Sequence, residues 1–201
     1  MQSSLFNQDA IDILPYNGDA TLYNNFFTAG ESNDYFRILM SDIQWKQEPI
    51  KIFGKEVMQP RLTAWYGDSD KPYSYSGITM QPNAWTKTLY AIKQKIEPAA
   101  GVIFTSALLN LYRNGSDSMG WHRDNEKELG DVPVIGSVSF GATRLFQFRN
   151  HKTKKDLRSL ELTDGSLLLM RGRTNHFWEH QVPKTSQPVK ERINITFRVI
   201  F

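Results

Sequence analysis

The sequence predicts a mainly β protein in which helices come first and an antiparallel sandwich or jelly roll follows. Hydrophobic residues recur at helical spacing in two segments before residue 100. From Val102 onward they recur at every second residue, and turn residues separate the candidate strands. We therefore expect an all-β core of about 100 residues behind a helical N-terminal part.

The two helical segments each place a row of apolar side chains on one face. The first covers residues 31–43, and the second starts after Pro82-Asn83 and is expected to end at Pro98. The apolar rows are Tyr35, Phe36, Leu39, Met40 and Ile43 in the first segment, and Trp85, Leu89, Ile92 and Ile96 in the second.

A hairpin and several short strands are predicted in the rest of the chain. The stretch between the helices is rich in turn and aromatic residues, and we expect a hairpin over residues 52–55 with Gly54 in its tight turn. Five later segments show strand patterns and are separated by turn signals such as Asn114-Gly115. These segments are residues 105–113, 137–140, 144–149, 166–170 and 192–201.

Composition restricts the chemistry that the chain can perform. It has 201 residues with no cysteine and four histidines, which excludes disulfides, thiolate-bound zinc or iron–sulfur clusters, and cysteine nucleophiles. No apolar run approaches the roughly 18 residues of a membrane span, and no basic residue precedes Arg37, as a charged signal peptide would require. We expect a soluble, unsecreted protein without membrane contact, cytoplasmic in a bacterium or nuclear in a eukaryote.

Charge is distributed unevenly along the chain. Residues 1–140 carry a net charge of −4 and residues 141–201 carry +7, which gives the overall +3. A basic cluster of this kind is typical of proteins that bind a polyanion such as nucleic acid. A lysine-rich loop over residues 151–158 that only keeps the protein in solution is the simpler explanation.

A His-x-Asp motif indicates a candidate metal site. On an extended backbone, the side chains of His122 and Asp124 point to the same face and can bind one ion. A distant histidine would complete the two-histidine, one-carboxylate arrangement that leaves open positions on Fe(II). His151, His176 and His180 are the candidates. His151 lies in the lysine-rich loop. The other two are four residues apart but lack the His-Glu-x-x-His zinc motif, and we prefer His180 to His176.

Polar residues on the predicted C-terminal strand suggest a second site. They occupy every even position, so Arg192, Asn194, Thr196 and Arg198 share one strand face. A solvated outer face would explain this alternation. Two arginines that flank two neutral hydrogen-bonding residues would also suit a small dicarboxylate. Asn110 and Tyr112, which share a face of another strand, could reach the same ligand.

Four segments form a recognisable combination, and they are Asn110-Leu111-Tyr112-Arg113-Asn114-Gly115, Gly120-Trp121-His122-Arg123-Asp124, Ser137-Val138-Ser139-Phe140-Gly141-Ala142 and Arg192-Ile193-Asn194-Ile195-Thr196-Phe197-Arg198. Together they resemble the AlkB family of Fe(II)- and 2-oxoglutarate-dependent dioxygenases. The likeness runs from about Ile50 to the C-terminus. It is strongest to the branch that acts on double-stranded DNA, through Ile52-Phe53-Gly54-Lys55, Pro60-Arg61 and Tyr66-Gly67-Asp68.

The resemblance implies a fold, a reaction and its cofactors. The fold would be a double-stranded β-helix, with residues 1–100 as a helical extension that handles DNA and residues 101–201 as the core, in one compact unit. The reaction would be oxidative demethylation of bases of the 1-methyladenine and 3-methylcytosine type during DNA repair. It would use Fe(II), 2-oxoglutarate and O2, and release formaldehyde, succinate and CO2.

The same resemblance assigns roles to individual residues. The iron ligands would be His122, Asp124 and His180, the last because it ends the matching stretch that runs from Gly165. The 2-oxoglutarate shell would consist of Asn110, Tyr112, Arg192, Asn194, Thr196 and Arg198. This shell agrees with the shared strand faces described above.

The resemblance further implies a monomer that binds duplex DNA and flips the damaged base out of the stack. Phe53 would be the wedge that fills the vacated space, in a hairpin with Gly54 and Lys55, and Arg61 would contact DNA nearby. The lid that stacks on the base would be Tyr73, Ser74 and Tyr75. The alternatives are that Phe53 plugs a local core and that the tyrosines form a turn packed on the sheet.

Two departures from the family pattern bear on the substrate. Relatives carry Asp-Asp-Glu where this chain has Asp124-Asn125-Glu126, which weakens charge complementarity to a cationic methylated base unless Glu126 compensates. Residues 183–190 match the family's complementary-strand contacts poorly. The same iron chemistry on RNA or protein, and a non-catalytic jelly-roll module that binds nucleic acid, remain alternatives.

The N-terminus carries a short motif of its own. Gln2, Leu5 and Phe6 resemble the Gln-x-x-Leu-Phe peptide by which bacterial proteins bind the replication sliding clamp. An N-terminal arm that packs on the core is the favoured explanation of these five residues.

Overall fold

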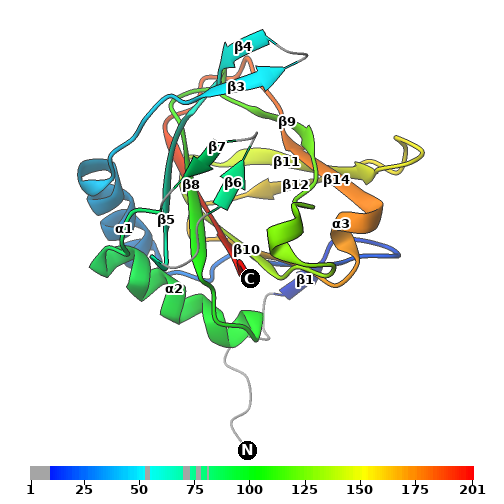
Figure 1. Cartoon of the computed structure of the whole chain (residues 1–201), viewed down its shortest axis with the longest axis horizontal. Coiled ribbons are helices and arrows are strands. Elements are labelled where there is room, and N and C mark those ends of the chain that lie inside the picture. Colours follow the sequence, from blue (N-terminus) through cyan, green and yellow to red (C-terminus); the bar gives the residue numbers. More distant parts are fainter. Residues whose placement is uncertain (1–9, 53–54, 70–72, 76–77, 81) are drawn as a thin grey trace, which may run out of the picture.

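The computed structural model describes residues 10–52, 55–69, 73–75, 78–80 and 82–201, and its strands form two main antiparallel sheets (Figure 1). The large sheet has the strand order β1 (Ala10–Asp12), β2 (Asp19–Tyr23), β13 (Leu167–Arg171), β10 (Ile135–Gly141), β15 (Arg192–Arg198), β8 (Ser106–Tyr112) and β5 (Leu62–Gly67). The small sheet has the order β12 (Arg158–Leu162), β11 (Arg144–Asn150), β14 (Trp178–Val182) and β9 (Met119–His122).

The chain crosses repeatedly between the two sheets. From β8 onward, β8, β10, β13 and β15 belong to the large sheet, while β9, β11, β12 and β14 belong to the small one. Such crossings are typical of a jelly roll. The predicted mainly β, antiparallel fold is therefore confirmed. Each of the five predicted strands starts within two residues of the first residue of an observed strand.

Strands from the first hundred residues complete the large sheet. β1 and β2 extend it beyond β13, and β5 pairs with β8 along its whole length, from Leu62 opposite Leu111 to Gly67 opposite Ser106. The sequence patterns did not predict these three strands. The sheet therefore draws on both halves of the chain.

Two amphipathic helices, α1 (Ala29–Asp42) and α2 (Lys87–Ala100), pack against the large sheet (Figure 1). α1 begins with a capping box in which Thr28 and Glu31 satisfy each other's backbone N–H groups. The predicted apolar rows are confirmed, since Leu39, Ile92 and Ile96 join Phe197 in one buried cluster. This packing keeps one face of the sheet dry and leaves the other face for the small sheet.

The predicted end of the second helix at Pro98 is wrong. Pro98 lies inside α2, which continues to Ala100. The helix ends because Gly101 adopts a left-handed conformation (φ 71°), while its N–H donates to the Glu97 carbonyl. Pro98 itself has no backbone N–H to donate within the helix.

A second apolar cluster fills the space between the sheets. It includes Tyr112 of β8, Phe146 and Phe148 of β11, Leu168 of β13 and Trp178 of β14. On β11 the two phenylalanines alternate with the polar residues Gln147 and Arg149. Tyr112 and Phe146 of this cluster line a cavity together with polar residues of β8 and β15.

Two hairpins lie outside the main sheets (Figure 1). β3 (Pro49–Ile52) pairs with β4 (Lys55–Met58), which confirms the predicted hairpin, although Phe53 and Gly54 lie outside the described residues. β6 (Tyr73–Tyr75) pairs with β7 (Ile78–Met80). Gln2, Leu5 and Phe6 also lie outside the described residues.

No helix in the described part of the chain has the length and apolar character needed to cross a membrane.

Candidate active site

Three side chains that can bind a metal ion meet between the sheets. His122 is the last residue of β9, Asp124 follows two residues later, and His180 lies in β14 directly opposite His122. One ligand atom from each lies within 4.8 Å of those of the other two. The structure therefore brings together the predicted triad.

The other two histidines lie elsewhere. His176 is in the short helix α3 (Thr174–Phe177), where its Nε2 is 2.7 Å from the backbone carbonyl of Asp131. His151 contacts the carboxylate of Glu179 at 3.4 Å. Neither imidazole reaches the triad.

The tautomer of His122 is fixed by its own strand. Its Nδ1 is 2.9 Å from the carbonyl of Gly120, which can only accept a hydrogen bond. Nδ1 therefore carries the proton, and Nε2 is left free to bind a metal ion. A histidine ligand oriented by a carbonyl in this way is common at metal sites.

The protonation states of the buried triad suit metal binding. Burial alone would raise the pKa of Asp124, but the Arg198 guanidinium and the two imidazoles outweigh it and lower that pKa to about 2. Burial, the neighbouring His122 and Arg198 lower the pKa of His180 to about 3. The site thus offers a carboxylate and a neutral imidazole, which are the forms that coordinate a cation.

The residues predicted to hold the dicarboxylate line the same cavity as the triad. They lie on β8 and β15, and they are Asn110, Tyr112, Arg192, Asn194, Thr196 and Arg198. Their exposed fractions are 1–9%. The alternative of a solvated outer face on β15 is therefore wrong, because this face of β15 looks toward the small sheet.

Two serines that the sequence reading did not assign support this face from β10. Ser139 Oγ accepts a hydrogen bond from Arg192 Nη2 at 2.9 Å. Ser137 Oγ accepts one from Asn194 Nδ2 at 2.8 Å, and Thr196 Oγ1 donates to Asn194 Oδ1 at 3.1 Å. The alternation of Ser137 and Ser139 around a buried Val138 is the signal that could have identified them.

The two arginines of β15 have different partners. Arg198 donates to the carboxylate of Asp124, at the metal end of the cavity. Arg192 lies at the other end of the strand, and its Nε and Nη1 are buried without a hydrogen-bond partner. Burial lowers the pKa of Arg192 to about 10, which still leaves it charged at neutral pH. A buried guanidinium with free donors is suited to bind a carboxylate.

Residues 19–198 match the 2OG-Fe(II) oxygenase superfamily. The chain belongs to this superfamily. Membership implies oxygenase chemistry with Fe(II), 2-oxoglutarate and O2. The residues of this oxygenase fit those cofactors, because the triad supplies a two-histidine, one-carboxylate ligand set and Arg192 offers unpaired donors to a distal carboxylate.

Individual relatives place the oxygenase among the AlkB homologues. It is 41% identical over 189 residues to the human alpha-ketoglutarate-dependent dioxygenase alkB homolog 3. The aligned region covers 90% of this chain but only 65% of the human protein. It is 35% identical over 188 residues to the human DNA oxidative demethylase ALKBH2, covering 89% of this chain and 72% of the relative. A solved structure of OsALKBH1 shares the fold alone, at 16% identity and a TM-score of 0.66, over 93% of this chain and 99% of the other.

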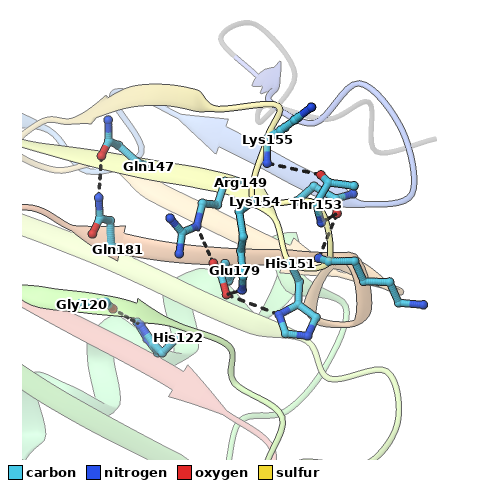
Figure 2. A network of polar contacts seen from close by, with 12 residues as sticks. Gly120, His122, Gln147, Arg149, His151, Thr153, Lys154, Lys155, Glu179 and Gln181 are labelled. Carbon is cyan, nitrogen blue, oxygen red and sulfur yellow. Dashed lines mark hydrogen bonds and ion pairs between the residues drawn. The ribbon is translucent and has the colours of Figure 1, made fainter.

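The outer face of the small sheet braces the strands that carry the oxygenase's histidines (Figure 2). Glu179 precedes His180 on β14, and its carboxylate accepts hydrogen bonds from Arg149 and from Lys154. Arg149 also stacks on Trp121, the neighbour of His122, with its Cζ 4.0 Å from the ring centroid. Burial would raise the pKa of Glu179, but the bonds from Lys154, Arg149 and His151 lower it to about 2.

This brace matters because the pairing between β9 and β14 is short. The two strands are paired only at His180 opposite His122 and at Val182 opposite Met119, with a register irregularity between these pairs. The chain of contacts from Trp121 through Arg149 to Glu179 joins β9, β11 and β14 on the face opposite the cavity.

Arg61 is not free to meet DNA at the surface. It directly precedes β5 and is buried. Its Nε donates to Asn110 Oδ1 at 2.7 Å, and its Nη1 donates to the Ser118 carbonyl at 3.2 Å. The prediction of a DNA contact is therefore not supported by this arrangement. Arg61 instead orients the amide of Asn110 in the cavity.

Two other predicted substrate residues follow Asp124 directly, and those of the hairpin and the lid belong to β4 and β6 or lie outside the described part of the chain. Asn125 is exposed directly after Asp124. Glu126 is half-buried, and its Oε2 is buried without a hydrogen-bond partner. The predicted lid residues Tyr73, Ser74 and Tyr75 form β6, and Lys55 begins β4.

Proposed function

We propose that this oxygenase removes methyl groups from alkylated bases in DNA, of the 1-methyladenine and 3-methylcytosine type. The observation that carries this proposal is the 35% identity to a DNA oxidative demethylase over most of both chains. The cavity supports it, because the metal triad and the two arginines of β15 line one enclosed space.

The residues of the chain divide the work of the reaction. When bound, Fe(II), 2-oxoglutarate and O2 supply the oxidation of an N-methyl carbon, which yields formaldehyde, succinate, CO2 and the repaired base. His122, Asp124 and His180 would hold the metal on one side and leave its other positions open. Arg192 would bind the distal carboxylate of 2-oxoglutarate, and the apolar walls around Phe146 would exclude water.

The proposed substrate is a base flipped out of duplex DNA. A base inside the stack cannot reach a buried metal site, so it must leave the helix first. Phe53 lies in sequence between β3 and β4, and the resemblance assigns it the role of an apolar wedge that fills the vacated space. Action as a monomer on DNA, in a bacterial cytoplasm or a eukaryotic nucleus, belongs to the same proposal.

A panel of oligonucleotides tests the substrate. We expect formaldehyde from duplex and single-stranded DNA that carries 1-methyladenine or 3-methylcytosine, and none from the His122→Ala variant. Phe53→Ala should reduce activity on the duplex roughly tenfold, since unstacking a base costs a few kcal/mol, and should leave single strands unaffected.

Other outcomes of the panel would redirect the proposal. Equal activity of Phe53→Ala on duplex and single strands would favour an RNA or protein substrate with the same iron chemistry. Binding without succinate production by the iron-loaded protein would favour a non-catalytic module.

A contact of Gln2, Leu5 and Phe6 with a sliding clamp is a separate proposal. A pull-down with purified clamp should lose the protein when Leu5 and Phe6 are both replaced by alanine. Unchanged capture of that double variant would contradict the contact.

A further inference from the structure

Arg144 is a buried cation that ties together the loops at one end of the cavity. It begins β11, and its side chain points between the sheets with an exposed residue fraction of 3%. Its guanidinium donates to the backbone carbonyls of Asn114 at 3.2 Å, Asp117 at 2.9 Å and Pro183 at 2.7 Å. It therefore joins the β8–β9 loop to the segment that follows β14.

Arg144 also shares an aromatic ring with Arg192. The Cζ of Arg144 is 5.4 Å from the centroid of the Tyr112 ring, and the Cζ of Arg192 is 5.1 Å from the same centroid. Tyr112 is 1% exposed and lies directly opposite Arg192 in the β8–β15 register. Two buried guanidinium groups thus contact one phenol.

Neither guanidinium has an ion pair with a carboxylate in the described part of the chain. Arg144 bonds only to carbonyl oxygens, Arg192 bonds to the hydroxyl of Ser139, and the nearby Asp117 carboxylate is bound by Arg113. Burial and the neighbouring Arg144 lower the pKa of Arg192, whereas Tyr112 raises it. Burial lowers the pKa of Arg144, and the charge of Asp117 acts against this effect and raises that pKa. In contrast, no carboxylate among the described residues forms an ion pair with Arg192, and an anion bound near Arg192 would offset the cost of burying that charge.

We propose that Arg144 is a positioning residue for 2-oxoglutarate, because it adds a second positive charge behind Tyr112 and holds that ring and Arg192 at the end of the cavity that receives the distal carboxylate. Arg144 acts through Tyr112 and Arg192. The proposal rests on the oxygenase family and its co-substrate, and it does not depend on which methylated substrate the enzyme takes.

Ligand binding to the Mn(II)-loaded protein tests this role without turnover. Calorimetry would compare 2-oxoglutarate with 2-oxopentanoate, which has the same keto acid end but no distal carboxylate. Arg144→Gln should weaken 2-oxoglutarate binding roughly tenfold, as expected for loss of one nearby charge in a protein interior. Binding of 2-oxopentanoate should change less than about twofold, because it lacks the charge that Arg144 attracts.

Arg113→Gln is the matched control for loop disruption. Arg113 forms an ion pair with the carboxylate of Asp117 in the same loop, with Nε 2.8 Å from Oδ2, but its side chain is 42% exposed. This variant should keep the preference for 2-oxoglutarate over 2-oxopentanoate. Arg144→Lys, which keeps the charge but cannot reach three carbonyls at once, should also keep most of that preference.

Three results would overturn the proposal. If Arg144→Gln weakened the binding of both ligands equally, Arg144 would only stabilise the loops that it joins. If it left the binding of both ligands unchanged, Arg144 would have no role toward the co-substrate. If Arg144→Gln fails to fold by circular dichroism, Arg144→Lys decides, because loss of the preference in that folded variant would rule out the role of charge. Failure to demethylate DNA would leave these binding results intact.

Discussion

Asn125 and Asp124 are adjacent, yet their surroundings differ completely. Asp124 is buried and bonded to Arg198, whereas Asn125 is exposed. Alternation on a strand predicted that His122 and Asp124 share a face, as do the polar residues of the C-terminal strand, whereas His180 and the full shell were assigned by the resemblance to the AlkB family. The sequence could not predict that Arg61 turns inward to Asn110, because a side chain's direction after a proline-containing turn depends on the packed neighbours.

For the single residue Asn125, we predict that Asn125→Asp raises demethylation activity on cationic bases. A carboxylate at this exposed position would attract a positively charged 3-methylcytosine, and kcat/KM should rise about two- to fivefold, since an exposed charge contributes less than about 1 kcal/mol. The measurement is formaldehyde release from single-stranded oligonucleotides, with neutral 3-methylthymine as the comparison base.

Asn33→Asp is the control for this change, because Asn33 is exposed on α1 and adds the same charge elsewhere. An equal rise with 3-methylthymine, or with Asn33→Asp, would show that charge at position 125 does not select the base.

Helices and strands differed in how well the sequence predicted them. The apolar rows of α1 and α2 are long and regular, so their spacing was sufficient. β9, β12 and β14 have only four or five residues each and were not predicted, although two of them carry the histidines of the triad. Short strands gain their stability from pairing partners distant in sequence, which a local pattern does not contain.

Glu31 links the two helices, and we predict that this link depends on pH. Glu31 caps α1 and accepts a hydrogen bond from Lys95 of α2, and the Lys95 bond is the main cause that lowers the pKa of Glu31 below 4.5. A carboxyl whose pKa is lower in the folded state stabilises the fold above its unfolded pKa and stops doing so as pH falls through the folded value. Glu31→Gln should therefore lower the free energy of unfolding at pH 7 and have less effect at pH 3.

Urea unfolding at the two pH values measures this difference. Asp34→Asn on the same helix is the control, since Asp34 pairs with Arg37 at an exposed site where screening by solvent is strong. A destabilisation by Glu31→Gln that is the same at both pH values would contradict the role of its charge.

The hydrogen bonds of Glu179 with Arg149 and Lys154 on the small sheet lead to a second prediction, about the stability of the strands. Glu179→Gln would leave Arg149 and Lys154 without their carboxylate partner and should lower the free energy of unfolding by about 1–2 kcal/mol. Glu161→Gln on β12 of the same sheet is the control, because Glu161 is exposed. Equal stability of the two variants would show that the Glu179 network adds nothing to the sheet.

Both halves of the chain contribute strands to the large sheet, and this sheet forms one side of the cavity. β5 brings residues 62–67 against β8, α1 and α2 cover the outer face of the large sheet, and the small sheet closes the inner face. The sequence predicted helices before strands, but β1 and β2 precede α1 in the structure. It also did not predict the pairing of β2 with β13, which joins residues more than a hundred positions apart. The residues that line the cavity all lie between Leu108 and Arg198, so the first hundred residues support its walls and do not line it.

Conversion of a methylated base in duplex DNA tests the central claim most directly. The iron-loaded protein is incubated with 2-oxoglutarate, O2 and a duplex oligonucleotide that contains one 1-methyladenine, and the DNA and succinate are then quantified by mass spectrometry. We predict loss of the methyl group with about one succinate formed per base repaired, and no conversion by His180→Ala. An unchanged oligonucleotide while the wild-type protein accumulates succinate would contradict the account, because the oxygenase would then act on a different substrate.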